Sequence, residues 1–468
     1  MTSKAVIIIG GPSRGTRFRP LALDQSKYLF PIAGKPLLSH TIDAILKIDS
    51  INEILLIGFY ENSIFEEFIN EYNSKFDYSN KNCRIKYLKE FKALGTAGGL
   101  YQYKDEILKN NNSDNFLLIH GDIICSFPLI QMIEKFESIK MLNNNTVSNN
   151  INLKKNDLSP DAILFGVNLD NYNYDLMLTM SSTYHTSFGL IAYDSKDHDK
   201  VIHYVEKPES KISNVINGGI YLFNINVFKL LSKAKIEKIQ KSNDENYYEF
   251  IDEDTLSIEH DILQKLPDLN KTYVFNYKGF WKTIKTPADA IIANELYLDL
   301  IYQSKSKDSL VKPSINISPP VFIDKSTNID YTMSTKFGPY VSIGKNCIIG
   351  SGCRIINSII LENVEIGSNT IIKNSIISKN CKIGNWSRIE GSGMNLVSIN
   401  ELIRKNGTSK MKALMETNEN FKVIGIRDSG NITILGSNVQ VKDEVLVFNS
   451  FVLPSKVIGE DLRYEVIM

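Results

Sequence analysis

The sequence has 468 residues, of which 43% are apolar and 23% are charged, an ordinary composition for a globular protein of two or three domains. Lys+Arg and Asp+Glu balance at 53 each, which argues against partners that need a global field, such as nucleic acid or an anionic membrane. The five cysteines form no CxxC pair and no zinc pattern with histidine, and the chain opens without a long apolar segment, so we expect a cytoplasmic protein with reduced thiols.

The first part of the chain, residues 1–305, alternates strand-like and helix-like segments. Continuous apolar runs, typical of strands covered on both faces, are found at residues 5–9, 53–58 and 116–122. Residues 36–46 have apolar side chains at helical spacing. This alternation predicts a Rossmann-like, mostly parallel α/β sheet. Its ligands should lie at the carboxyl ends of the strands, where Gly10-Gly11 and Gly121-Asp122 fall. An Asn-rich stretch at about 141–157 is expected to be a surface insertion.

From about residue 320 the apolar period changes to six. The isoleucines at these positions are Ile343, Ile349, Ile355, Ile377, Ile383 and Ile389. The tetrad Asn357-Ser358-Ile359-Ile360 recurs at 374–377 and more loosely at 449–452. Hexapeptide repeats of this kind predict a left-handed parallel β-helix over residues 306–468, with roughly 18 residues in each coil.

Two consequences follow from this repeat. Cys347 and Cys353 are one hexapeptide apart, which predicts stacked core cysteines and not metal ligands. The register is also interrupted, and we expect a long polar loop at about 391–431 to leave one face of the helix. Loops of that length are usually functional or disordered.

The glycine-rich loop after the first strand, residues 10–20, is a candidate phosphate site. Its glycines allow backbone N–H groups to approach a triphosphate closely. Arg17 and Arg19 supply charge-assisted donors, and Lys27 adds a compact charge. The order of strand, glycines, two arginines and lysine predicts nucleotide binding.

This loop resembles the signature G-G-x-G-T-R-L-R-P…P-K-P-L of the sugar-1-phosphate nucleotidylyltransferases. Further stretches are similar to that family's motifs: Leu94 to Gly99, Gly121-Asp122, Glu206-Lys207-Pro208 and Asn217 to Tyr221. The resemblance implies that nucleotide is bound by Gly10, Gly11, Gly15, Thr16, Gly95, Thr96 and Gly98. It implies sugar and phosphate contacts from Glu206, Lys207, Asn217 and Gly218. It implies catalytic roles for Arg17, Lys27 and Asp122, with Asp122 also a ligand of Mg²⁺.

With a β-helix after the first domain, the chain is most similar to GDP-mannose pyrophosphorylases and, among these, to alpha-type subunits. The family's reaction joins mannose 1-phosphate to GTP and releases pyrophosphate. The resemblance therefore implies GTP, mannose 1-phosphate and GDP-mannose as ligands. It also implies a catalytic beta subunit as partner, and self-association through the β-helix.

Three departures from the family pattern bear on catalysis. Gly11 and Gly15 are separated by three residues where the family has one, and Ser26-Lys27-Tyr28 replaces P-K-P. Thr283 stands where the family has a second metal-binding Asp, and Lys285 replaces a glycine of the same motif. Losing one preorganised electrostatic group costs about 2–4 kcal/mol in the transition state, or roughly 30- to 1,000-fold in rate. We therefore expect a GDP-mannose-binding regulatory subunit whose own turnover is weak.

Alternatives stay open at this point. The chain could be an independently active guanylyltransferase, with Asp122 and a water holding the metal. It could be a subunit of a translation-initiation exchange factor, although those often carry a further helical domain after the β-helix. Single motifs also have purely structural interpretations. Lys207 could be a surface lysine, and Gly98-Gly99 could mark only the start of a helix. We expect His120 to be a hydrogen-bonded structural residue near the site and not a catalytic one.

Overall fold

The structure is a computed structural model. It describes residues 2–11, 16–79, 83–109, 113–147, 159–169, 187–242, 252–304, 310–392 and 431–468. The chain divides into two compact units. The first contains Met1–Arg14 and Thr41–Trp281, and the second contains Gly15–His40 and Lys282–Met468.

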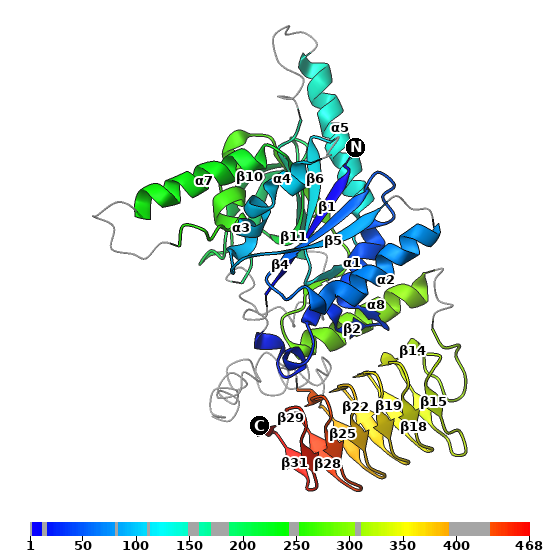
Figure 1. Ribbon diagram of the computed structural model, residues 1–468. Helices are drawn as coiled ribbons and strands as arrows, with labels where there is room; N and C mark the ends of the chain where they lie inside the picture. Colours follow the sequence, from blue (N-terminus) through cyan, green and yellow to red (C-terminus); the bar gives the residue numbers. More distant parts are fainter. Residues whose placement is uncertain are drawn as a thin grey trace. The chain divides into compact units, whose positions relative to one another are not determined.

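The first unit is built on a nine-stranded sheet (Figure 1). In sheet order its strands are β5 (Arg84–Lys89), β4 (Glu53–Gly58), β1 (Lys4–Gly10), β6 (Asn115–His120), β11 (Val215–Asn224), β8 (Ala162–Asn168), β12 (Thr272–Tyr277), β10 (Lys200–Val205) and β9 (Leu190–Asp194). Neighbours among β5, β4, β1 and β6 are parallel, as are β8 and β12, whereas β11 and β10 run against the others. The predicted mostly parallel α/β sheet is confirmed.

Helices pack on this sheet because each carries an apolar stripe. The packed helices are α2 (Ser63–Ser79) on β5, α3 (Gly95–Gln102) on β1 and β4, and α5 (Leu129–Val147) on β8 and β11. Helix α7 (Val227–Ser242) packs on α3 and on the π-helical segment η8 (Glu259–Leu263). Shorter elements are α1 (Leu37–Ile45), α4 (Lys104–Leu108), β7 (Ile123–Cys125), η9 (Pro267–Leu269) and β13 (Trp281–Thr283).

The Asn-rich stretch begins inside a helix, and the expected surface insertion at about 141–157 stays a prediction. Residues 141–147 continue α5, where Met141 and Leu142 are 63% and 44% exposed. Residues 148–157 lie outside the described part of the chain.

The second unit is a three-sided parallel β-helix. One face holds β14 (Val321–Ile323), β17 (Val341–Ile343), β20 (Ser358–Ile360), β23 (Ser375–Ile377), β26 (Thr433–Leu435), β29 (Phe451–Val452) and β32 (Val466–Ile467). The next holds β15 (Asn328–Ile329), β18 (Ile348–Ile349), β21 (Glu365–Ile366), β24 (Lys382–Ile383), β27 (Gln440–Val441) and β30 (Val457–Ile458). The third holds β16 (Lys336–Phe337), β19 (Arg354–Ile356), β22 (Ile371–Lys373), β25 (Arg388–Glu390), β28 (Leu446–Phe448) and β31 (Leu462–Arg463).

Asparagines shape one corner of this β-helix. Asn346, Asn363, Asn380 and Asn438 all have positive φ, a conformation that Asn tolerates better than most residues. The amide of each donates to the next, at 3.3, 3.1 and 3.1 Å. The steps span 17 residues until the last, which spans 58. The coil register therefore resumes at β26 after the interruption, and residues 393–430 lie outside the described residues.

The cysteines of the β-helix are buried, as predicted. Cys347 and Cys353 do not stack on one another, however, because they lie at two corners of the same coil. The register of β18, β21 and β24 places Cys381 in the column of Cys347 instead, with Val364 between them. The six-residue period shows which side chains point into the core. Which of them stack on one another depends on the length of a full coil, which is 17 residues here.

The segment that precedes α1 belongs to the second unit, whereas the sequence grouped it with residues 1–305. It contains η2 (Thr16–Phe18), η3 (Leu21–Leu23), η4 (Lys27–Leu29), β2 (Pro31–Ile32) and β3 (Lys35–Pro36). The backbone N–H of Ala33 donates to Asn294 of α8 (Pro287–Gln303) at 3.0 Å. The Ser342 hydroxyl of β17 donates to the same amide oxygen at 2.6 Å. One buried asparagine thus joins the segment to the β-helix.

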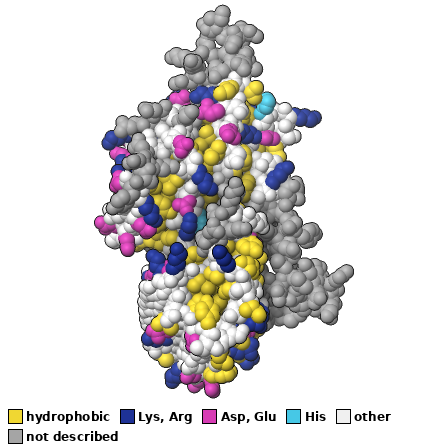
Figure 2. Space-filling view, turned by 90° about the vertical axis from the view of Figure 1, so that its right-hand side faces the viewer, with side chains coloured by type: hydrophobic (Ala, Val, Ile, Leu, Met, Phe, Trp, Pro, Cys, Tyr) yellow, Lys and Arg dark blue, Asp and Glu magenta, His cyan; other side chains and the backbone are white. Residues whose placement is uncertain are grey.

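The equal numbers of acidic and basic residues in the sequence suggest a surface without a large patch of one charge. Figure 2 shows Lys and Arg side chains interspersed with Asp and Glu over the face that it draws. Within the described residues, no helix is both long enough and apolar enough to cross a membrane.

Candidate functional site

Strand β1 ends at Gly10, so the first two glycines of the predicted phosphate loop, Gly10 and Gly11, lie at its carboxyl end. Gly10 has a φ of 54°, and its carbonyl oxygen accepts a hydrogen bond from the Phe59 N–H at 2.7 Å. A Cβ on Gly58 would lie 2.6 Å from the same oxygen. Close approach of β1 and β4 therefore requires small residues here, and it leaves Gly11 at the carboxyl edge of the sheet. Gly15 lies outside the described residues.

The predicted base-contacting loop packs against the segment that leads into η8. Gly95 has a φ of 84°, and a Cβ on it would lie 2.4 Å from the Leu256 carbonyl oxygen. A Cβ on Gly98 would lie 2.5 Å from the Leu94 Cβ and 3.0 Å from the Asp254 carbonyl oxygen. Helix α3 begins at Gly95, so these glycines do mark a helix entry. Their contact with a base remains a prediction.

The predicted sugar motifs meet in one hydrogen-bond network. The Tyr204 hydroxyl donates to Glu206 at 2.7 Å. The amide of Asn217 donates to the hydroxyls of Tyr204, at 3.2 Å, and Tyr221, at 2.8 Å. The Asn217 amide oxygen accepts from the Gly219 N–H at 3.1 Å. Tyr204, which was not among the predicted site residues, thus joins Glu206 to Asn217, and Tyr221, at the end of the predicted stretch, holds Asn217 from its other side.

Burial keeps both tyrosines neutral. Desolvation raises the pKa of Tyr204 and that of Tyr221 well above the ordinary phenol value. Their hydroxyls consequently remain hydrogen-bond donors throughout the neutral range. Lys207 adopts a left-handed φ of 45°, and its exposed ammonium group lies 3.3 Å from the largely buried carboxylate of Glu206.

The turn after Asn217 is fixed by an indole. Trp281 is buried, and its Nε1–H donates to the Gly218 carbonyl oxygen at 2.9 Å. A Cβ on Gly218 would lie 2.3 Å from the ring of Phe165. Gly218 is therefore needed for packing, whatever ligand lies beyond it.

Asp122 follows β6 at the carboxyl edge of the sheet. The Gly121 N–H donates to the Ile8 carbonyl oxygen at 2.8 Å, which continues the β1–β6 ladder up to the aspartate. Asp122 itself is half-buried. Across the ranges that the structure describes, no three His, Cys, Asp or Glu side chains come together as a metal site.

We expected both ring nitrogens of His120 to be hydrogen-bonded within the fold, and this expectation is wrong for one of them. Its Nε2 is buried and has no hydrogen-bond partner among the described residues. The ring lies edge-on to Tyr221, with 5.9 Å between centroids. His120 precedes Gly121 and faces the glycine turn, where a Cβ on Gly219 would lie 3.6 Å from it.

Three further predicted residues belong to the second unit. Thr16 and Arg17 form the exposed side of η2, which buried Phe18 anchors by an edge-to-face contact with Phe30. Lys27 begins η4, and its ammonium group donates to the Ile284 carbonyl oxygen at 3.2 Å.

The segment that contains Thr283 is held by a helix cap. Asp289 in the first turn of α8 accepts from the N–H groups of Lys285 and Thr286, at 2.9 and 2.7 Å, and from the Thr286 hydroxyl at 2.9 Å. Its other oxygen lies 3.1 Å from the Lys282 ammonium group. The Asp289 carboxylate is thus engaged by the cap and by Lys282.

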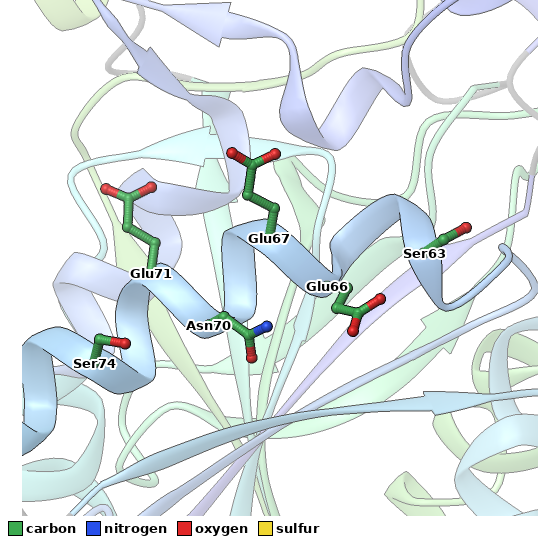
Figure 3. Close-up of a pocket in the computed structure, with 6 residues that line it drawn as sticks. All are labelled: Ser63, Glu66, Glu67, Asn70, Glu71 and Ser74. Carbon is green, nitrogen blue, oxygen red and sulfur yellow. The ribbon is translucent and has the colours of Figure 1, made fainter.

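A hollow on α2 can be set aside as a phosphate site. It is lined by Ser63, Glu66, Glu67, Asn70, Glu71 and Ser74, all from one helix (Figure 3). Its charged lining is carboxylate only, which repels phosphate groups. Glu71 also pairs with Lys75 at 2.7 Å on the exposed surface.

Comparisons with known proteins agree with the fold. The nucleotidyl transferase family model matches residues 4–151 and 171–284, and the GMPPB C-terminal domain model matches residues 317–468. A "Probable mannose-1-phosphate guanyltransferase" of Schizosaccharomyces pombe is 38% identical over 478 residues, covering 100% of both chains. A "Mannose-1-phosphate guanylyltransferase regulatory subunit alpha" of Dictyostelium discoideum is 34% identical, covering 100% of this chain and 99% of its own.

A third relative, the "regulatory subunit alpha-B" of Danio rerio, is 32% identical, covering 99% of this chain and 100% of its own. These matches extend through both units, and none of the three carries the name of an exchange factor. The chain therefore belongs to the nucleotidyl transferase family, within its group of mannose-1-phosphate guanylyltransferases.

Proposed function

We propose that this chain is an alpha-type subunit that binds GDP-mannose, turns over weakly by itself, and regulates a catalytic beta subunit. The reaction of the assembly would join mannose 1-phosphate to GTP and release pyrophosphate. The proposal rests on the names of the relatives and, above all, on the charge carried by the segment around Thr283.

That segment is the observation that carries the proposal. Thr283 replaces the expected acid, and the carboxylate of Asp289, in the first turn of α8, is engaged by the helix cap and by Lys282. The Lys27 ammonium group donates a hydrogen bond to the carbonyl oxygen of Ile284, the residue that follows Thr283. The lysines of this segment can still attract a phosphorylated ligand, whereas a second metal ion, which would help to neutralise departing pyrophosphate, has no acid at position 283 to hold it.

The sugar motifs support retention of the nucleotide sugar. Glu206 is a hydrogen-bond acceptor held by Tyr204, and Asn217 is held by two neutral hydroxyls. A preorganised acceptor and amide lose little entropy when they bind the hydroxyl groups of a hexose. We propose that this network holds the mannose ring and that Lys207, which is exposed, contacts the phosphate.

For the metal, Asp122 is the one predicted ligand. Mg²⁺ commonly keeps waters and takes one or two carboxylates together with phosphate oxygens, so a single aspartate fits an ion that arrives with the nucleotide. When bound there, Mg²⁺ would neutralise charge on the phosphates. The glycines at the end of β1 would admit these phosphates. Phosphate binding by Arg17 and Lys27 remains a prediction.

A second candidate is an independently active guanylyltransferase. The observation in its favour is that Asp122 stands at the end of β6, within the expected motif. It requires that one carboxylate and water suffice for turnover.

Calorimetry of the purified chain separates the two. We expect GDP-mannose to bind without Mg²⁺ and more tightly than GTP. In parallel, pyrophosphate release from GTP, Mg²⁺ and mannose 1-phosphate should be slow until the catalytic subunit is added. Strict Mg²⁺ dependence with GTP preferred, together with rapid release by the isolated chain, would favour the second candidate.

A further inference from the structure

Glu259 makes direct contact with the predicted base-contacting loop, although it belongs to no recognised motif. Its Oε2 accepts a hydrogen bond from the Thr96 hydroxyl at 2.9 Å and another from the Ser257 hydroxyl at 2.7 Å. The Thr96 hydroxyl in turn accepts from the Ile258 N–H at 2.8 Å. The hydroxyl of Thr96 thus both donates and accepts within the fold, and Glu259 fixes its orientation.

The backbone of the loop is locked to the same segment. The Ala97 N–H donates to the Leu256 carbonyl oxygen, and the Leu256 N–H donates to the Leu94 carbonyl oxygen, both at 2.9 Å. Gly95 and Gly98 allow this approach, because side chains there would collide with the segment. The position of the loop is consequently set by residues 254–259 as much as by its own sequence.

That backing segment is itself held by cations. Lys238 donates to the Thr255 carbonyl oxygen at 2.8 Å and pairs with Asp261 at 2.9 Å. Asp261 also accepts from the Ser257 N–H at 2.8 Å. Lys235 lies 3.1 Å from Asp254. Glu259 therefore projects from a rigid support, which is what a positioning residue requires.

Glu259 is ionised in this setting. Burial raises the pKa of its carboxyl group, but the charge of His120 and the hydrogen bonds of Ser257 and Thr96 outweigh that effect and hold the pKa below its usual range. Glu259 also interacts electrostatically with Tyr221, which binds Asn217. The carboxylate therefore lies in the same polar neighbourhood as the sugar network.

We infer that Glu259 is a positioning residue for nucleotide recognition: by fixing Thr96 it holds the Leu94–Gly99 loop in the register that selects the base. This inference rests on the proposed binding of GDP-mannose. A site built to hydrogen-bond one base rejects an analogue that lacks the matching group, but only while its own groups are held in place. In catalysis a displacement of about 1 Å can cost about 100-fold in rate, and hydrogen bonds to a base depend on position in the same way.

Four single variants of the full chain, and the double variant that combines Thr96→Val with Glu259→Ala, test the inference. Thr96→Val keeps the shape of the side chain and removes both hydrogen bonds, whereas Thr96→Ser keeps them. Glu259→Ala removes the acceptor, whereas Glu259→Gln keeps an acceptor oxygen for Thr96. Calorimetry would give the dissociation constants of GDP-mannose and of IDP-mannose, which lacks the 2-amino group of guanine. Thermal melts would report stability separately.

We expect Thr96→Val and Glu259→Ala each to reduce the preference for GDP-mannose over IDP-mannose by about tenfold, as for the loss of one buried hydrogen bond. The double variant should lose no more than either single one, since both break the same contact. Glu259→Gln and Thr96→Ser should retain most of the preference.

An unchanged preference in Thr96→Val and Glu259→Ala, with only a lower melting temperature, would show a purely structural role and overturn the inference. Equal losses in Glu259→Gln and Glu259→Ala would show that charge, and not the bond to Thr96, matters, and would overturn it too. Failure of the unaltered chain to bind GDP-mannose is a different result, because it removes the proposed function on which the inference depends.

Discussion

Lys27 and Ile284 are 257 positions apart in the chain, yet the ammonium group of the first donates to the carbonyl oxygen of the second at 3.2 Å. The bond places a predicted phosphate-binding lysine beside the segment in which Thr283 replaces an acid. Two departures from the family pattern, at the P-K-P motif and at the second metal-binding position, thus lie next to each other. Their combined effect on charge can be tested by restoring the acid.

Thr283→Asp is expected to raise the rate of pyrophosphate release by the isolated chain about tenfold or more. A carboxylate here would supply the missing negative charge for a metal ion, a contribution worth about 2–4 kcal/mol in comparable sites. The measurement is a coupled pyrophosphate assay with GTP, Mg²⁺ and mannose 1-phosphate. Thr283→Asn is the matched control, being similar in size to Asp but uncharged, and it should leave the rate unchanged. A rise in the control equal to that of Thr283→Asp would argue against a charge effect.

Tyr204→Phe should weaken GDP-mannose binding by about tenfold, as expected for loss of one buried hydrogen bond, while leaving GTP binding as it was. The hydroxyl joins Glu206 to Asn217, so its removal releases the acceptor predicted to hold the sugar. Calorimetry with both ligands gives the comparison.

The control for this prediction is Tyr193→Phe on β9. The Tyr193 hydroxyl accepts from the Asn276 amide at 2.7 Å, so this variant also loses a tyrosine hydrogen bond but lies outside the sugar motifs. Both variants should still fold, as thermal melts would report, and only Tyr204→Phe should lose affinity for GDP-mannose. Equal loss of both ligands in Tyr204→Phe would point to a general disturbance of the site.

The sequence analysis predicted those parts of the molecule that depend on local pattern. The apolar run at 5–9 correctly predicted a buried strand, and the isoleucines spaced by six correctly predicted a parallel β-helix, because each pattern reflects the local burial of its own side chains. The contact of Thr96 with Glu259 joins residues 163 positions apart, and neither residue belongs to a repeat from which the contact could be predicted. Likewise, nothing near Ala33 indicated that Asn294 would tie it to the β-helix. Tertiary contacts of this kind depend on which elements meet, and periodicity does not contain that information.

Buried thiols give a prediction of pH dependence. Burial raises the pKa of Cys347 from 9.0 to about 11 and that of Cys381 to about 12. A raised pKa means that the folded state favours the protonated thiol, so this stabilisation is complete below pH 9.0 and is lost as the pH rises towards 11 and 12. All five cysteines are buried, so a thiol reagent at pH 8 should label none of them until denaturant is added. Rapid labelling of the native chain would contradict this, because the thiolate is the reactive form.

The asparagine column of the β-helix separates the effect of backbone conformation from that of the side-chain ladder. Asn380 has a φ of 59° and bonds both Asn363 and Asn438 through its amide. Asn380→Gly loses the two side-chain bonds but keeps access to positive φ, whereas Asn380→Ala loses both advantages. We expect Asn380→Ala to lower the free energy of unfolding by about 1–2 kcal/mol more than Asn380→Gly, since left-handed φ costs a non-glycine residue about that much. Urea denaturation of the full chain, followed by far-UV circular dichroism, measures the difference. Equal destabilisation by the two variants would mean that the amide ladder, and not the left-handed turn, is why asparagine occupies this corner.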